Sequence, residues 1–316
     1  MNFFEYFIKD KEINKAITSS NIKIGSCANA FQMMMIASDF NSGSATIFVV
    51  LPNLYEAQNY YDKLSNILGE DNVLFFPSDE LLSVEMISST GDFLYERIET
   101  IITLLNKEKK VVVLSIHGLS RYEMNKDRWI NSFISLKKDN TYNRKELINN
   151  LIKLGYNKNY TTIKTGEFSS RGEIIDIYPF GRENPIRIDF FDDEIETIKE
   201  YNPDTQRSTR EINELFIVPC QEFFYDDDEL KSAINKLNEY INNNDISELE
   251  KNMILEDISN LENHEKLNQM TRYLSLFDDK ETNILSFVDN KKIYFIDPYL
   301  AKEKIKRLEK DLKDYS

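Results

Sequence analysis

One short stretch near the N-terminus has the outline of a nucleotide-binding loop. Gly25 opens the segment GSCANAFQ, which follows an apolar run and leads into a helical pattern. A phosphate-binding loop, GxxxxGK[ST], uses glycines to bring backbone amides to the phosphates, a lysine to reach their oxygens, and a hydroxyl to hold magnesium. Here Ala30, Phe31 and Gln32 stand at the second glycine, the lysine and the hydroxyl positions. The loop is degenerate, and we expect no nucleotide hydrolysis there.

A second candidate for nucleotide chemistry is the run KKIYFIDPY, which begins at Lys291. An apolar strand that ends in an aspartate resembles a Walker B motif, in which a catalytic acid usually follows the aspartate. Pro298 follows Asp297 here, and a proline cannot polarise a water molecule. The better interpretation is that Asp297 ends a buried strand at a turn.

The sequence contains few residues suited to metal binding or to acid–base catalysis. The two histidines, His117 and His264, are far apart, which excludes a histidine-rich zinc site and leaves little for catalysis by histidine. The cluster from Asp192 to Glu194 could bind a cation, but adjacent carboxylates on a strand point to alternate faces. We therefore expect a solvated turn there, no catalytic residue, and no metal or cofactor in this region.

Composition narrows the class of partner. The chain has 316 residues, of which 41% are hydrophobic, and a formal net charge of −15. Such acidity opposes sequence-independent nucleic-acid binding, which depends on clustered lysine and arginine. Two distant cysteines, no signal-peptide pattern and no apolar run long enough to span a bilayer favour a cytoplasmic protein.

The order of elements predicts an α/β lobe with a large insert. Residues 1–127 alternate apolar runs, at Ile22, Ala45, Asn72 and Lys109, with helical patterns, which indicates a parallel sheet covered by helices. Residues 128–219 change to short alternating strands with Gly, Pro and Asn turns, typical of an α+β domain with antiparallel hairpins. Residues 220–316 become helical and acidic, then return to the lobe with two apolar runs, from Asn283 and from Lys291.

The run PIRIDFF in the insert combines a dry face with an unusual polar face. Side chains two apart on a strand share a face, so Ile186, Ile188 and Phe190 should point to the core. Arg187 and Phe191 then lie on the other face with Asp189. Either this face binds a partner, or a neighbouring loop covers Phe191 while Arg187 and Asp189 form a surface ion pair worth little.

The stretch RGEIIDIYPFGRENPIRIDFFDDEIETIKEYNPDTQRS resembles a signature of the bacterial transcription-repair coupling factor, Mfd, and of its relative, the excinuclease subunit UvrB. In that family it belongs to an insert called domain 2. The runs LFFPSDELLSVEMISSTGDFLYERIETIITLL and MTRYLSLFDDKETNILSFVDNKKIYFIDPY are similar to the two parts of the family's α/β lobe that flank it. The resemblance implies a degenerate RecA-like lobe with an inserted domain: 1a at 1–127, 2 at 128–219 and 1b at 220–316.

Two departures separate the relatives. UvrB has an intact phosphate-binding loop and a long tyrosine-rich hairpin that clamps DNA. Here the loop is degenerate, and too few residues lie between Pro77 and Arg97 for that hairpin. Both features match the N-terminal, UvrB-like region of the coupling factor. The domain that contacts RNA polymerase and the motor that binds ATP, magnesium and DNA would then lie beyond Ser316.

The resemblance also implies a partner. In the family, domain 2 recruits UvrA, the damage-recognition ATPase of nucleotide excision repair. The family's interface positions fall on Arg171, Arg187 and Phe191, and all three residue types match. Two alternatives remain: a UvrB-like ATP-dependent enzyme that processes DNA, and a structural module that restrains the motor of a longer protein.

Overall fold

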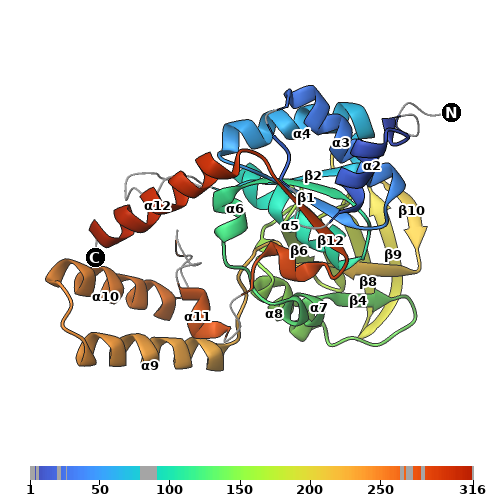
Figure 1. Cartoon of the computed structure of the whole chain (residues 1–316). Coiled ribbons are helices and arrows are strands. Elements are labelled where there is room, and N and C mark those ends of the chain that lie inside the picture. Colours follow the sequence, from blue (N-terminus) through green and yellow to red (C-terminus); the bar gives the residue numbers. More distant parts are fainter. Residues whose placement is uncertain are drawn as a thin grey trace. The chain divides into compact units, whose positions relative to one another are not determined.

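The structure is a computed structural model that describes residues 4, 7–19, 23–25, 27–78, 91–263, 267, 273–278 and 282–314 (Figure 1). The chain forms two compact units. Unit 1 comprises Met1–Arg121 and Asn283–Ser316, and unit 2 comprises Tyr122–Thr282. No helix among the described residues is long and apolar enough to cross a membrane.

Unit 1 is built on a four-stranded parallel sheet with the order β12-β1-β3-β2. Its strands are β1 (Thr46–Leu51), β2 (Val73–Phe76), β3 (Val111–Ser115) and β12 (Lys291–Phe295). Every residue of β1 and β3 is buried, as expected for central strands covered on both faces. The sequence expectation of a parallel-sheet α/β lobe with a returning C-terminal strand is confirmed.

Helices of unit 1 alternate with its strands along the chain, and two of them precede the first strand. Ile36 and Phe40 of one helix and Ala57 and Leu64 of the next pack against the central strands in one core cluster. The elements are α2 (Lys11–Thr18), α3 (Asn29–Ser42), α4 (Leu54–Leu68), η1 (Glu70–Asn72), α5 (Gly91–Leu105), α6 (Ile116–Ser120), η3 (Ile284–Phe287) and α12 (Pro298–Asp314).

Two expected strands of unit 1 are not strands. The run from Asn283 is the 3₁₀ helix η3, because the Asn283 side chain accepts a hydrogen bond from the Leu285 amide at 3.1 Å and caps the turn. Ile284 and Phe287 are buried three residues apart, a spacing that suits a 3₁₀ helix. In the run from Ile22, the described residues 23–25 and 27–28 have no regular structure. Both neighbours of β1 in the sheet are other strands, β12 and β3.

Unit 2 contains a six-stranded sheet with the order β10-β9-β8-β7-β6-β5, antiparallel except for the β5–β6 pair. Its strands are β5 (Asn157–Lys158), β6 (Glu167–Arg171), β7 (Ile174–Ile177), β8 (Ile186–Phe191), β9 (Glu194–Tyr201) and β10 (Ser208–Ile212). A smaller antiparallel pair joins β4 (Ile134–Lys137) to β11 (Glu214–Ile217). The expected antiparallel insert is confirmed, although its first long strand begins at Glu167 rather than at Thr161.

One face of the six-stranded sheet is dry. Leu147 and Leu151 of α8 (Arg144–Lys153) pack in one buried cluster with Ile175, Ile188 and other side chains of β6 to β9. The remaining helices of unit 2 are α7 (Lys126–Ser132), α9 (Asp227–Asn243), α10 (Glu248–Glu262) and α11 (Leu274–Phe277). The expected segments were 1–127, 128–219 and 220–316. In the structure, residues 220–282 belong to the same compact unit as the insert.

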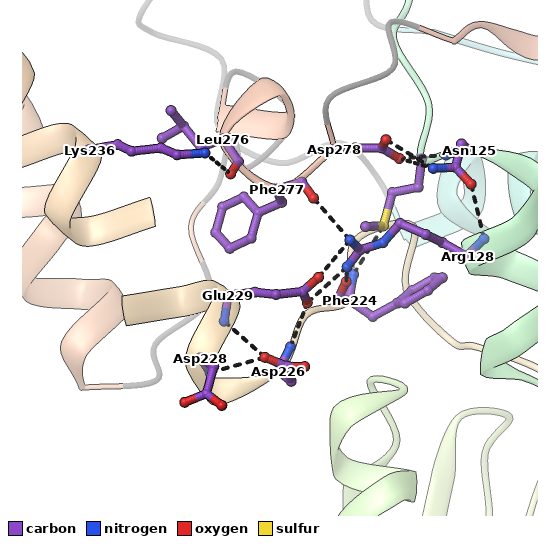
Figure 2. Close-up of polar contacts among 11 residues, drawn as sticks. Asn125, Arg128, Phe224, Asp226, Asp228, Glu229, Lys236, Leu276, Phe277 and Asp278 are labelled. Atoms are coloured by element: carbon purple, nitrogen blue, oxygen red, sulfur yellow. Dashed lines mark hydrogen bonds and ion pairs between the residues drawn. The ribbon is translucent and has the colours of Figure 1, made fainter. Parts of the chain in front are cut away.

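A polar cluster within unit 2 joins α7 to the helices that follow the sheet (Figure 2). Arg128 donates to both carboxylate oxygens of Glu229, at 2.7 and 2.9 Å. It also donates to the carbonyl oxygens of Phe277 and Phe224, at 2.9 and 3.1 Å. Glu229 completes a capping box with Asp226 at the start of α9. One guanidinium therefore fixes the start of α9, the end of α11 and the strand-to-helix connection.

Asp278 makes the complementary contact in the same cluster. Its carboxylate accepts hydrogen bonds from the backbone and the side-chain amide of Asn125, each at 2.9 Å. Asn125 is the N-cap of α7 and accepts from the Arg128 amide. The residues that attach α11 to α7 therefore also set where α7 begins.

Arg128→Ala should lower the free energy of unfolding by about 2 kcal/mol, because hydrogen bonds to charged groups contribute about 1.5–3 kcal/mol each and this pair is partly exposed. Urea unfolding followed by circular dichroism measures the change. Lys138→Ala is the matched control, since the Lys138–Glu211 pair has the same 2.7 Å N–O distance on the surface and should matter little. Equal losses in the two variants would contradict a structural role for Arg128.

Candidate docking site on the six-stranded sheet

Strand β8 alternates between a buried and an exposed face, as its sequence predicts. Phe191 is 67% exposed, and no neighbouring loop of the described chain covers it. Arg187 and Asp189 are partly exposed on the same side. The buried residues of β8 are Ile186, Ile188 and Phe190. The interpretation in which a loop covers Phe191 is therefore wrong for the described chain.

Cross-strand pairing places the third predicted residue on that same face. Arg171 at the end of β6 pairs with Ile174 of β7, and Ile174 pairs with Asp189 of β8. Directly paired side chains project to the same side of an antiparallel sheet. Arg171, Arg187 and Phe191 therefore share the outer face. The exposed Ile174 lies between Arg171 and Asp189 in one cross-strand row.

Arg187 is held by an ion pair with Asp176 of β7. Its Nε lies 2.7 Å from Asp176 Oδ1 and its Nη2 lies 2.8 Å from Oδ2. Its guanidinium also lies over the Tyr201 ring, 4.7 Å from the centroid. The hydrogen bonds with Asp176 raise the pKa of Arg187 above its ordinary value. Burial raises the pKa of Tyr201 to about 12, so this phenol stays neutral.

The alternative ion pair between Arg187 and Asp189 is not observed. Asp189 instead accepts a hydrogen bond from the Thr197 hydroxyl at 2.6 Å and lies 3.6 Å from the Lys199 ammonium. Both of these partners are on β9. The sequence analysis missed Asp176 because the alternation of a strand shows which residues share its face, but not the register in which the strand pairs with the next one of the hairpin.

Arg171 has a different environment. It is exposed, and its Nη2 donates to the carbonyl oxygen of Tyr160 at 2.7 Å. The Tyr160 side chain is 95% exposed. Arg171 has no carboxylate partner among the described residues, so it keeps its charge available for a ligand. Tyr160 was not predicted, since no motif in the loop before β6 indicated it.

Backbone hydrogen bonds hold the β8–β9 hairpin that carries Phe191. Asp192 in the turn of this hairpin has a positive φ of 54°. Residues 139–142 bond to the hairpin: the Asp139 amide donates to the Ile195 carbonyl oxygen at 2.8 Å, and the Tyr142 amide donates to the Asp193 carbonyl oxygen at 2.7 Å. Asp192 and Asp193 are exposed, as the predicted solvated turn requires. Among the described residues, no group of three His, Cys, Asp or Glu side chains could hold a metal.

The segment that the sequence analysis compared with a nucleotide-binding loop makes contacts within unit 1. Ala30, Phe31 and Gln32 lie in the first turn of α3, which has no side-chain N-cap. Gln32 donates to the Cys27 carbonyl oxygen at 3.2 Å and accepts from the Tyr60 hydroxyl.

Aromatic side chains also contact this segment. Phe31 stands at the lysine position and packs edge-to-face on Phe7, with ring centroids 5.6 Å apart. Burial raises the pKa of Tyr60 to about 12, so its hydroxyl remains a neutral donor to the loop. Gly25 opens the loop in irregular backbone. The side chains of this segment therefore pack and bond within unit 1.

Asp297 caps the helix that follows it. Its side chain accepts from the Leu300 amide at 3.1 Å, directly before α12. Pro298 is the first residue of that helix, where a proline is well tolerated. The predicted turn is present, but β12 is a partly exposed edge strand, so the expectation of a buried strand is wrong.

The histidines lie outside the candidate site. His117 lies in the short helix α6 after β3. His264 lies outside the described residues. Neither residue belongs to the outer face of the six-stranded sheet.

Comparisons with known proteins match the segment that carries this face. Residues 134–223 match the UvrB interaction domain family. Curated transcription-repair-coupling factors match more of the chain: that of Bacillus subtilis (strain 168) is 26% identical over 310 residues, covering 94% of this chain and 26% of the relative.

Staphylococcal relatives give the same result. The transcription-repair-coupling factor of Staphylococcus haemolyticus (strain JCSC1435) is 25% identical over 236 residues, 74% of this chain and 20% of its own length. The chain thus spans about a quarter or less of the length of these relatives. The resemblance indicated by the sequence is confirmed: over most of its length the chain is similar to the N-terminal region of the transcription-repair-coupling factors, and residues 134–223 match the UvrB interaction domain family.

Proposed function

We propose that this chain is the non-catalytic, UvrB-like module of a bacterial transcription-repair-coupling factor, and that it recruits UvrA in transcription-coupled nucleotide excision repair. One observation carries the proposal: Phe191, 67% exposed, shares the outer face of the sheet with Arg171 and Arg187. The family match over residues 134–223 includes all three.

The composition of this face suits a protein–protein contact. Binding energy at interfaces concentrates in a few aromatic and arginine side chains. A phenylalanine left in water forgoes about 1.5–3 kcal/mol of burial, which a partner can recover. The backbone of the β8–β9 hairpin is already fixed by residues 139–142, so ordering it on binding costs little.

The rest of the pathway lies with segments outside this chain. ATP and magnesium would act in the motor of the full-length protein, an ATP-dependent DNA translocase that displaces stalled RNA polymerase in the cytoplasm. RNA polymerase and DNA would be partners of those segments. A restraining effect of this module on the motor is compatible with the proposal. A docking face that is covered in the full-length protein would both restrain the motor and, once uncovered, bind UvrA.

Phe191→Ala should weaken UvrA binding by about 2 kcal/mol or more, roughly 30-fold, because it removes the exposed aromatic anchor. Its thermal unfolding should barely change, since the ring has few contacts to lose. Biolayer interferometry with immobilised UvrA measures the affinity. Phe216→Ala is the matched control, because Phe216 is 57% exposed on the smaller sheet of the same unit. Wild-type affinity in the Phe191 variant would refute UvrA docking on this face.

Magnesium–ATP should leave the melting temperature of this chain unchanged. A ligand at 100 times its dissociation constant stabilises a protein by about 2.7 kcal/mol, which a thermal shift assay detects readily. The side chains that would bind phosphate and magnesium are replaced by Phe31 and Gln32, and Gln32 is bonded within the unit. A saturable increase of several degrees at millimolar ATP would instead favour an ATP-dependent enzyme.

A further inference from the structure

Asp176 is a buried carboxylate on the outer face of the sheet. It is 4% exposed, because Arg187 lies over it. Its cross-strand neighbour on β6 is Ser169, which is 2% exposed. The Thr162 hydroxyl lies 3.3 Å from both Ser169 Oγ and the Asp176 carbonyl oxygen. Asp176 is therefore enclosed on this face and cannot itself touch a partner protein.

Arg187 has little freedom above this carboxylate. Its Nε and Nη2 are bonded to Asp176, and Nη2 also lies 3.3 Å from Gln206 Oε1. One face of the guanidinium is against the Tyr201 ring. Nη1 makes no hydrogen bond to a described residue, while the side chain as a whole keeps 24% of its surface exposed. The guanidinium thus has one fixed orientation and one edge left for a ligand.

We propose that Asp176 is a positioning residue of the docking site: it holds Arg187 so that Nη1 donates to a neutral carbonyl oxygen of the partner. This inference rests on the proposed function. The charge of Arg187 is already balanced by Asp176, so a second carboxylate would gain little there, whereas a carbonyl oxygen accepts the remaining N–H groups. Arg171 has no such carboxylate and suits a charged acceptor better.

The geometry also shows why Arg187→Ala alone is a poor test of contact. That variant would leave Asp176 buried without its partner, and an uncompensated buried charge destabilises the fold. Loss of binding could then follow from a disturbed sheet. The informative variants change Asp176 while Arg187 stays, or remove both partners together.

Asp176→Asn keeps the size of the side chain and removes the charge that orients Arg187. We expect its affinity for UvrA to fall about 10-fold or more, measured by biolayer interferometry well below the melting temperature. Asp176→Glu, which moves the carboxylate by one methylene, should weaken binding in the same direction and serves if the Asn variant does not fold. Ile198→Val, a buried change on the dry face, lowers stability without touching the pair and should bind like the wild type.

A double variant distinguishes contact of Arg187 with UvrA from its role in stabilising the fold. Asp176→Leu combined with Arg187→Met removes both charges, and replacing both members of a buried pair is far less damaging than removing one. The double variant should melt above Arg187→Ala yet still bind at least 10-fold more weakly than the wild type. Wild-type affinity in the double variant would show that Arg187 does not contact UvrA. Wild-type affinity in the folded Asp176→Asn or Asp176→Glu variant would show that Arg187 needs no positioning.

The experiments distinguish a failure of the proposed function from a failure of this inference. If Phe191→Ala also binds like the wild type, UvrA does not dock on this face at all. If only the Phe191 variant is impaired, the face docks UvrA but the Arg187–Asp176 pair plays no part in recognition.

Discussion

The two-sidedness of the six-stranded sheet is the constraint on which the candidate site depends. Alternate residues of β8 must enter the core beneath α8, so the others have no choice but to face outward. A shift of one residue would bury Arg187 and expose Ile188. The dry face therefore fixes the register, and the register fixes which side chains face outward. The same pairing of strands thus sets both the stability of the sheet and the composition of the face that we propose as a docking site.

The sequence predicted the sides of β8 but not its surroundings. Periodicity along one strand was enough to place Phe191 outside and Phe190 inside, and both placements are correct. Which residue lies opposite Arg187 depends on the register of the β7–β8 hairpin, and the loop between Ile177 and Ile186 does not fix that register in the sequence. Asp176 consequently stayed unrecognised, although it is the closest charged neighbour of a predicted site residue.

Short apolar runs were the other source of error. The run at Ile284 contains enough apolar residues for a strand, but its buried positions recur every three residues and Asn283 caps the first turn. Local side-chain capping outweighs a weak strand preference in so short a segment. The run that forms β12 was correctly assigned as a strand, yet its burial was overestimated. A sequence cannot show that a strand will occupy the edge of its sheet, since that depends on which other strands are present.

The two candidate regions show opposite uses of polar groups. In the nucleotide loop, Gln32 and Tyr60 bond to each other and Asp297 caps α12, so these polar groups are satisfied inside unit 1. On the outer face of the sheet, Arg171 and Phe191 are left incompletely partnered, although the backbone that carries them is firmly bonded. An aromatic side chain that is 67% exposed contributes little to the fold of the isolated chain. The firmly bonded hairpin would lower the conformational-entropy cost of binding, because the strand and its turn need not be ordered when a partner binds. A firmly bonded backbone beneath exposed side chains distinguishes this face from the loop, and it is the physical reason why we propose that recognition takes place on the sheet.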